Sequence, residues 1–339
     1  MKNVLLPEGL GAEGETMLEG RANILRSART DEKALCEAAG EADGIVLRSK
    51  ARITEAVLQC APRLRAVSRT GVGYDNVDVG ACTRHGVMVC YLPGINAYAV
   101  AEHTIALMLA LLKQLPLMDR AVRMCGKARR DGSKGSDPAL DSGAASEGWN
   151  IRGRNLPQDA RGKTLGILGL GRVGREVAAR ARAFGMDIIG YDPFVKDAEG
   201  VAWMEADEVV ARADVLTLHL PESDETRNFM DAGRLALMKP AAYLINTSRG
   251  GVVDQGALAA ALSGRRIAGA ALDVFRDEPP APDDALLALD NALLTPHIAA
   301  LTEQCGAAMM REAVGQLLTA LDGGMPPHVV NIKELAQRT

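Results

Sequence analysis

Short apolar runs alternate with amphipathic stretches along almost the whole chain. In the first hundred residues the segments between these runs have helical periodicity, and one of them opens at Asp31, a residue type typical of helix N-caps. Five runs predict strands: residues 4–6, 23–25, 44–47, 65–68 and 87–90. A repeated strand–helix–strand pattern predicts a parallel sheet with helices on both faces.

A second run of the same kind begins at Gly162. Its predicted strands are residues 164–168, 187–191, 215–218, 242–246, 267–272 and 292–294. A final helix over residues 303–321 is stopped by Gly323-Gly324. The pattern therefore predicts an α/β protein with two doubly wound parallel sheets.

The segment between these two runs has a different character. Residues 97–124 predict one long helix, apolar on nearly every side around residues 105–112, and such a helix must be buried between domains or subunits. Gly, Ser, Asp and Lys dominate residues 126–150, which we interpret as a long surface loop. This loop is either a tolerated insertion or a lid over an active site.

Composition narrows the class of protein. A length of 339 residues suggests about two domains, and a net charge of −4 indicates neither a nucleic-acid nor a membrane partner. The longest apolar run has eight residues, too short to span a bilayer, and no signal-peptide core is present. Six scattered cysteines without a C-x-x-C motif predict reduced thiols in a cytoplasmic protein, with no metal site.

The segment from Gly169 to Gly174 reads G-L-G-R-V-G between a predicted strand and a predicted helix. In a dinucleotide site the first glycine makes the tight turn, the second admits the pyrophosphate and the third lets helix and strand pack closely. The helix N-terminus then offers free N–H groups to the phosphates. The predicted cofactor residues here are Gly169, Gly171, Arg172, Val173 and Gly174.

Asp192 ends the next strand, 18 positions after Gly174. A carboxylate at this place accepts hydrogen bonds from the adenosine ribose and repels a 2′-phosphate. No arginine follows it in Pro193-Phe194-Val195, so NAD is favoured over NADP. The alternative is a solvated Asp at a strand end.

Charged residues also follow three later strands, at Arg249, Glu278 and His297. Ligands of open parallel sheets bind at the carboxyl ends of strands, so these side chains could converge on one crevice. Each has an ordinary alternative: a surface arginine, a polar loop residue and a hydrogen-bonded core histidine.

These residues stand in motifs that resemble the D-isomer-specific 2-hydroxyacid dehydrogenases, among them the phosphoglycerate dehydrogenases. The motifs are G-L-G-R-V-G, Y-D-P, N-T-S-R-G-G-V-V-D, A-L-D-V-F-x-x-E-P, T-P-H, R-T-G-V-G-Y-D-N-V-D and A-V-A-E-H-T, and the resemblance covers residues 44–321. It implies a discontinuous, flavodoxin-like substrate domain, residues 1–98 plus 299–339, interrupted by a Rossmann NAD-binding domain, residues 99–298.

The resemblance also implies the chemistry. Arg249 would bind the substrate carboxylate and polarise the 2-oxo group. His297 would exchange a proton with the substrate oxygen as hydride moves between nicotinamide and C2, and Glu278 would orient the imidazole. The product of this reaction is a D-2-hydroxy acid.

Further roles follow from the same resemblance. Val72 and Gly73 resemble a backbone cradle for the substrate carboxylate, and Asp273 resembles the residue that holds the nicotinamide carboxamide. Thr104, Leu220 and Thr247 resemble residues that line the cofactor. Arg48 and Ser49, with Arg69, resemble a segment that meets a second anionic group. The helix over residues 98–124 resembles the interface of a homodimer.

Some features leave the substrate and the function open. Ala299 stands where many relatives have glycine, and a chain ending at residue 339 leaves no room for a regulatory domain. 3-Phosphoglycerate and hydroxypyruvate or glyoxylate are the leading substrates, with sulfonated hydroxy acids also open. The alternative function is an NADH-sensing binding protein resembling the C-terminal-binding-protein corepressors, and a formate- or phosphite-type dehydrogenase is a lesser rival.

Overall fold

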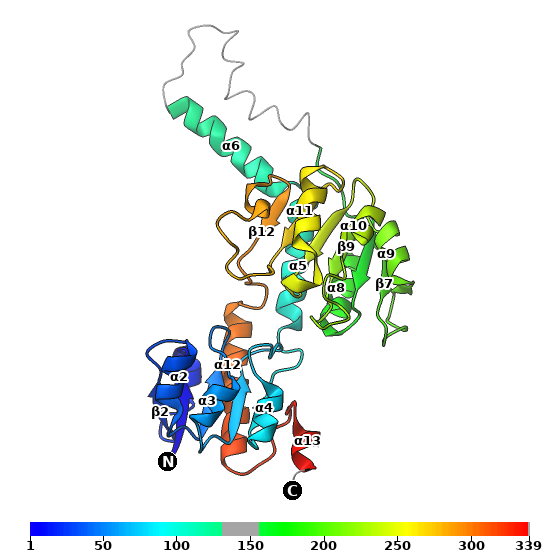
Figure 1. Ribbon diagram of the computed structural model, residues 1–339. Helices are drawn as coiled ribbons and strands as arrows, with labels where there is room; N and C mark the ends of the chain where they lie inside the picture. The colour runs from blue at the N-terminus through cyan, green and yellow to red at the C-terminus, as the bar shows by residue number, and fades with distance from the viewer. Residues whose placement is uncertain (131–155, 338–339) are drawn as a thin grey trace. The chain divides into compact units, whose positions relative to one another are not determined.

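The computed structural model describes residues 1–130 and 156–337 and divides into two compact units (Figure 1). Unit 1 contains Met1–Ala97 and Ala300–Thr339, and unit 2 contains Tyr98–Ala299. The chain thus enters unit 2 at Tyr98 and leaves it at Ala299, so unit 1 is built from two segments that are far apart in the sequence.

Unit 1 holds a five-stranded parallel sheet of order β2-β1-β3-β4-β5, which is the flavodoxin-like order. The strands are β1 (Lys2–Leu6), β2 (Ala22–Arg26), β3 (Gly44–Leu47), β4 (Ala66–Arg69) and β5 (Met88–Cys90). The helices are α1 (Gly11–Thr16), α2 (Glu32–Ala39), α3 (Glu55–Gln59), α4 (Val79–Arg84), α12 (Glu303–Leu321) and α13 (Ile332–Ala336).

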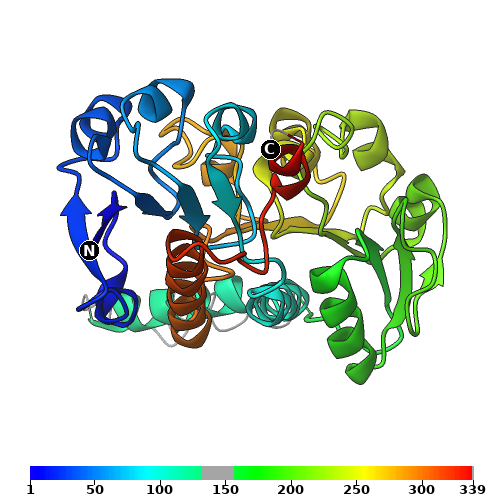
Figure 2. The same ribbon diagram turned by 90° about the horizontal axis from the view of Figure 1, so that it is seen from below.

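Helices cover both faces of this sheet. Figure 2 shows α1 and α12 on one side of the strands and α2, α3 and α4 on the other. Buried strand residues such as Ile45 and Val67 pack with Val57 and Leu58 of α3. On the other face the Ser68 hydroxyl donates to the Ala313 carbonyl of α12 at 2.8 Å.

Unit 2 holds a seven-stranded parallel sheet of order β12-β11-β10-β9-β6-β7-β8. The strands are β6 (Thr164–Leu168), β7 (Asp187–Tyr191), β8 (Ala202–Trp203), β9 (Val215–Leu218), β10 (Tyr243–Asn246), β11 (Gly269–Leu272) and β12 (Ala292–Leu294). The helices are α5 (Ala97–Leu112), α6 (Leu115–Arg130), α8 (Arg172–Ala183), α9 (Ala206–Arg212), α10 (Ala232–Leu237) and α11 (Gln255–Ser263), with 3₁₀ turns at Gly250–Val252 and Ala285–Ala288.

Alternate strand residues of unit 2 point to opposite faces and form two cores. Leu216 and Leu218 join the core on the side of α9, α10 and α11. Val215 and Ile245 join the core on the side of α5 and α8. Two parallel sheets, each covered on both faces, confirm the predicted fold class.

The predicted single helix over residues 97–124 is wrong. The structure has two helices there, because Gln114 takes a left-handed backbone conformation with φ of 52° and ends the first. The second helix continues to Arg130, so residues 126–130 are helical and not part of a loop. The remainder of the predicted insertion, residues 131–150, lies outside the described residues.

The burial of α5 has a cause within its own unit. Ala101, Ile105, Met108 and Leu112 pack into the unit 2 core, so a second chain is not needed to cover them. Exposed apolar side chains in the segment 98–124 include Tyr98, Leu115 and Val122. The homodimer through this segment stays a prediction. None of the helices in the described ranges is long and apolar enough to span a membrane.

Candidate active site

The glycine-rich turn between β6 and α8 is built from close backbone contacts. Gly169 has a φ of 99°, and a Cβ on it would lie 2.5 Å from the His219 carbonyl oxygen. A Cβ on Gly174 would lie 2.0 Å from the Gly169 oxygen, which forces glycine at this position. Gly171 caps α8, and nothing lies within 4 Å of a Cβ built on it. This space in front of a helix N-terminus fits a pyrophosphate.

The Asp192 side chain is fixed by backbone N–H groups at the end of β7. Its Oδ2 accepts from Leu170 N at 2.8 Å, and its Oδ1 accepts from Phe194 N at 2.8 Å and Val195 N at 3.0 Å. The residue is 9% exposed. The carboxylate therefore cannot swing away from the turn that would hold the phosphates.

The loop that carries Arg249 is organised by Asn246, the last residue of β10. The Asn246 amide donates to the Arg249 carbonyl at 2.8 Å, and its Oδ1 accepts from the backbone and hydroxyl of Ser248. Asn246 is buried, whereas Arg249 is half-buried. The guanidinium also donates to the Ser248 carbonyl at 2.8 Å.

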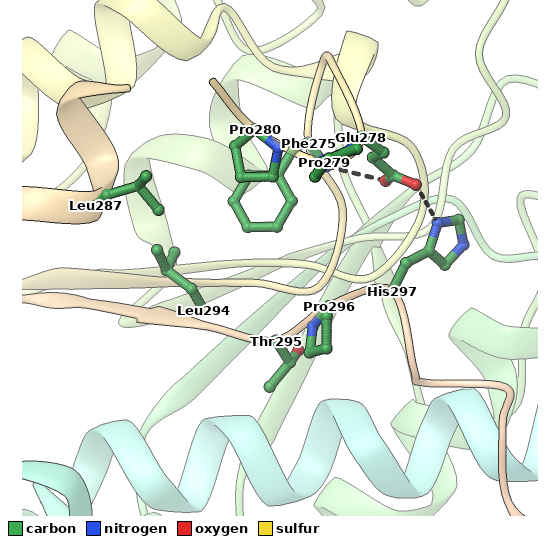
Figure 3. Close-up of a pocket in the computed structure, with 9 residues that line it drawn as sticks. All are labelled: Phe275, Glu278, Pro279, Pro280, Leu287, Leu294, Thr295, Pro296 and His297. Atoms are coloured by element: carbon green, nitrogen blue, oxygen red, sulfur yellow. Dashed lines mark hydrogen bonds and ion pairs between the residues drawn. The ribbon is translucent and has the colours of Figure 1, made fainter. Parts of the chain in front are cut away.

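His297 and Glu278 form a hydrogen-bonded pair past the last two strands (Figure 3). The distance from His297 Nδ1 to Glu278 Oε2 is 2.7 Å, and the other carboxylate oxygen accepts from Phe275 N at 3.1 Å. Burial acts to raise the pKa of Glu278, but the hydrogen bonds from His297 and Phe275 and the positive charge of Arg249 outweigh it and hold that pKa below its usual range. The carboxylate is thus ionised near neutral pH.

An apolar cavity of about 370 Å³ adjoins this pair. Figure 3 shows Glu278 pointing towards the imidazole while apolar residues line the rest of the cavity. These lining residues are Phe275, Pro279, Pro280, Leu287, Leu294, Thr295 and Pro296. Within residues 1–130 and 156–337 no group of three or more His, Cys, Asp or Glu side chains could hold a metal ion.

Four residues expected near the cofactor lie on this sheet or beside it. The Thr104 hydroxyl of α5 lies 2.9 Å from the Thr247 hydroxyl, just past β10, and both residues are buried. Leu220 is buried two positions after β9. The Asp273 side chain is fully buried and accepts hydrogen bonds from Ile298 N and Ala299 N at 2.9 Å each. Its contact with a carboxamide stays a prediction.

The residues expected to meet substrate in unit 1 follow β3 and β4. Arg69 lies opposite Leu47 in the sheet register, so Arg48 and Arg69 both stand at one carboxyl edge. Asn76 connects them, because its amide donates to the Arg48 carbonyl at 2.9 Å and its Oδ1 accepts from Arg69 Nε at 3.3 Å.

The other expected substrate residues flank these arginines. Val72 and Gly73 are half-buried in the loop after β4. Ser49 is exposed directly after Arg48.

Residues 105–299 match the family model for the NAD binding domain of D-isomer specific 2-hydroxyacid dehydrogenases. This match covers more than half of the chain. The chain belongs to this family.

Two relatives named for their activities resemble most of the chain. The D-3-phosphoglycerate dehydrogenase of Archaeoglobus fulgidus is 40% identical over 77% of this chain and 46% of that protein. The glyoxylate reductase of Aeropyrum pernix is 38% identical over 88% of this chain and 85% of its own. The chain thus spans about half the length of the first relative and most of the second.

One solved structure of the same architecture is that of an enzyme named for NADPH and not for NADH. The NADPH-dependent glyoxylate/hydroxypyruvate reductase of Sinorhizobium meliloti, in complex with citrate, has a TM-score of 0.82 and 29% identity. The match covers 97% of this chain and 98% of that one. The resemblance to the dehydrogenase family inferred from the motifs is confirmed, and the choice between NAD and NADP stays open to test.

Sequence reasoning missed two residues that organise the candidate site. Asn246 and Thr295 carry no charge that would mark them, and their importance lies in which buried groups they contact. Their places in N-T-S-R-G and T-P-H, directly beside Arg249 and His297, were the available signal.

Proposed function

We propose that this protein is an NAD-dependent oxidoreductase that interconverts a D-2-hydroxy acid and its 2-oxo acid. The observation that carries the proposal is the His297–Glu278 pair at 2.7 Å with the Arg249 charge beside it, in the same unit as the glycine-rich turn. A cation, an oriented imidazole and a dinucleotide site are the parts that hydride transfer to a carbonyl requires.

The chain's own residues divide the work between binding and proton transfer. The Arg249 guanidinium binds the substrate carboxylate and draws electrons from the 2-oxo group. Because ionised Glu278 accepts from Nδ1–H, it fixes the orientation of the imidazole, and His297 Nε2 donates a proton to the 2-oxo oxygen. When bound, a reduced nicotinamide would supply hydride to C2, so that the 2-oxo acid, NADH and one proton would give the 2-hydroxy acid and NAD⁺.

The geometry of Asp192 supports NAD over NADP. Three backbone N–H groups hold the carboxylate in place, so it cannot turn aside for a 2′-phosphate. Residues 193–195 bring no cation that would neutralise that phosphate. The NADPH-dependent relative makes this preference a point for direct measurement.

The substrate class is proposed from unit 1. Val72 and Gly73 offer backbone N–H groups, and Arg48 and Arg69 at one sheet edge add positive charge for a second anionic group. We therefore expect 3-phosphoglycerate and its 2-oxo acid first, and hydroxypyruvate or glyoxylate next. The protein would act in the cytoplasm as a homodimer, with no metal ion.

The test is the loss of NADH absorbance with the pure protein and a panel of 2-oxo acids. The panel contains phosphohydroxypyruvate, hydroxypyruvate, glyoxylate and sulfopyruvate, each repeated with NADPH. Turnover of one acid with NADH supports the proposal. Tight NADH binding without turnover of any acid would instead favour the NADH-sensing alternative.

A further inference from the structure

Both chain segments that connect the two units lie close to one buried carboxylate, that of Asp273. The returning segment is attached directly, because Ile298 N donates to Asp273 Oδ1 and Ala299 N donates to Oδ2, each at 2.9 Å. The outgoing segment continues into α5, whose His103 Nε2 lies 3.6 Å from Oδ1, beyond the distance of a direct hydrogen bond. The proposed general acid, His297, lies within the returning segment.

His297 itself has a strained backbone, with a φ of 53°. The left-handed region is unfavourable for a residue with a side chain, so neighbouring contacts must maintain it. His297 N donates to the Asp273 carbonyl at 2.8 Å and to the Thr295 carbonyl at 3.1 Å. The N–H groups of the next two residues, Ile298 and Ala299, donate to the Asp273 carboxylate. Asp273 alone therefore determines the direction of the loop that carries His297.

Thr295 links the carboxylate to α5. Its hydroxyl donates to Asp273 Oδ1 at 2.6 Å, and its oxygen lies 3.2 Å from His103 Nε2 (Figure 3 shows Thr295 on the side of the loop towards α5). The hydroxyl has only one hydrogen to donate, and it donates this hydrogen to the Asp273 carboxylate. The His103 nitrogen must therefore carry the hydrogen of the second bond, and the chain of donors runs from His103 through Thr295 to Asp273.

We propose that Thr295 and His103 are positioning residues for the general acid, acting on His297 through Asp273. This inference rests on the proposed function. The Asp273 carboxylate is fully buried, so a lost donor cannot be replaced by water, and the carboxylate turns towards its remaining partners. That turn releases the strained loop and moves the imidazole relative to Glu278 and the substrate oxygen. A displacement of about 1 Å costs on the order of 10²-fold in rate.

The experiment compares Thr295→Val, which keeps the shape and removes the hydroxyl, with Thr295→Ser, which keeps the hydroxyl. We expect Thr295→Val to lower kcat roughly 10- to 100-fold. We expect Thr295→Ser to keep kcat within about threefold of the parent. Thr319→Val is the matched control, because it removes a hydroxyl that donates to Gly315 within α12 of unit 1.

A second pair of variants tests α5. His103→Leu removes the donor and should lower kcat, whereas His103→Gln keeps an N–H group at a similar reach and should restore it. This pair carries the test if Thr295→Val does not fold. A kcat within twofold of the parent in both Thr295→Val and His103→Leu would overturn the proposal, as would equal losses in the Val and Ser variants.

A readout without turnover separates this inference from the proposed function. Nitrogen-15 NMR of the five histidines reports the tautomer and hydrogen bonding of each ring. The His297 signals should change in Thr295→Val and stay unchanged in Thr319→Val. If the parent reduces no 2-oxo acid, the proposed function fails. The positioning role is refuted separately, by His297 signals that stay unchanged in Thr295→Val.

Discussion

At the residue scale, the site depends on side chains that are held by backbone groups. Asp192 accepts three backbone N–H groups, Asn246 shapes the Arg249 loop, and Asp273 shapes the His297 loop. Each of these groups is buried. A buried polar side chain with several partners has one orientation, and this rigidity prepares the site before ligands arrive.

Replacing Asp192 tests the ribose contact. Asp192→Ala should weaken NADH binding by roughly 10- to 100-fold, because hydrogen bonds to a charged acceptor contribute about 1.5–3 kcal/mol each. Asp192→Asn keeps an acceptor for the backbone and should narrow the preference for NADH over NADPH. Titration calorimetry measures both, with Asp187→Ala at the exposed start of β7 as control. Unchanged NADH affinity in Asp192→Ala would show that the ribose is bound elsewhere.

The half-buried His219 predicts a dependence of stability on pH. Burial lowers its pKa from 6.5 to about 3, so below pH 6.5 the unfolded chain binds a proton that the folded chain does not. Stability must therefore fall as the pH falls. Between pH 6.5 and 5 the parent should lose roughly 1–2 kcal/mol more than His219→Gln in urea unfolding. The exposed His328→Gln is the control, and parallel losses in parent and His219→Gln would contradict the account.

At the element scale, the sequence predicted most strands of unit 2 to the residue. Residues 164–168, 187–191 and 215–218 are apolar runs between clear turn signals, and these are the bounds of β6, β7 and β9. The break between α5 and α6 was not predicted, because one left-handed Gln114 between two helical patterns leaves only Pro116 as a sign. The two-residue β8 is too short for any periodicity to show.

A glycine next to Arg249 tests how tightly these elements pack. A Cβ on Gly250 would lie 1.9 Å from the Phe275 carbonyl oxygen, which is backbone and cannot move aside easily. Gly250→Ala should lower the free energy of unfolding by roughly 1–3 kcal/mol and lower kcat with it. The control is Gly315→Ala in α12, where nothing lies within 4 Å and a gain of about 1 kcal/mol is expected. Denaturant unfolding measures the free energy of unfolding of both variants. A free energy of unfolding in Gly250→Ala equal to that of the parent would contradict the close contact.

At the scale of the whole molecule, the proposed substrate residues come from both units. Arg249, Glu278 and His297 belong to unit 2, whereas Arg48, Val72 and Gly73 belong to unit 1. The quoted family motifs contain five of these residues, and Arg48 was expected from the resemblance of the segment after β3. The identity of the substrate could not be predicted in the same way, because it depends on the charge and shape of the binding residues and not on the motifs that contain them.

Arg48 tests the substrate class. Arg48→Ala should raise the KM for phosphohydroxypyruvate about tenfold or more and leave the KM for glyoxylate within about twofold, because only the first has a second anion to bind. Lys33→Ala on α2 removes the same charge away from the sheet edge and serves as control. Equal increases in KM for phosphohydroxypyruvate and glyoxylate would show that Arg48 does not bind a second anionic group.

The central claim is that His297 transfers the proton during reduction of a 2-oxo acid. The most direct measurement is kcat and the Kd for NADH in His297→Ala, with the exposed His328→Ala as control. The account predicts a kcat lower by roughly 10²- to 10⁴-fold with the Kd for NADH unchanged within about threefold. Turnover at the parent rate in His297→Ala would contradict it.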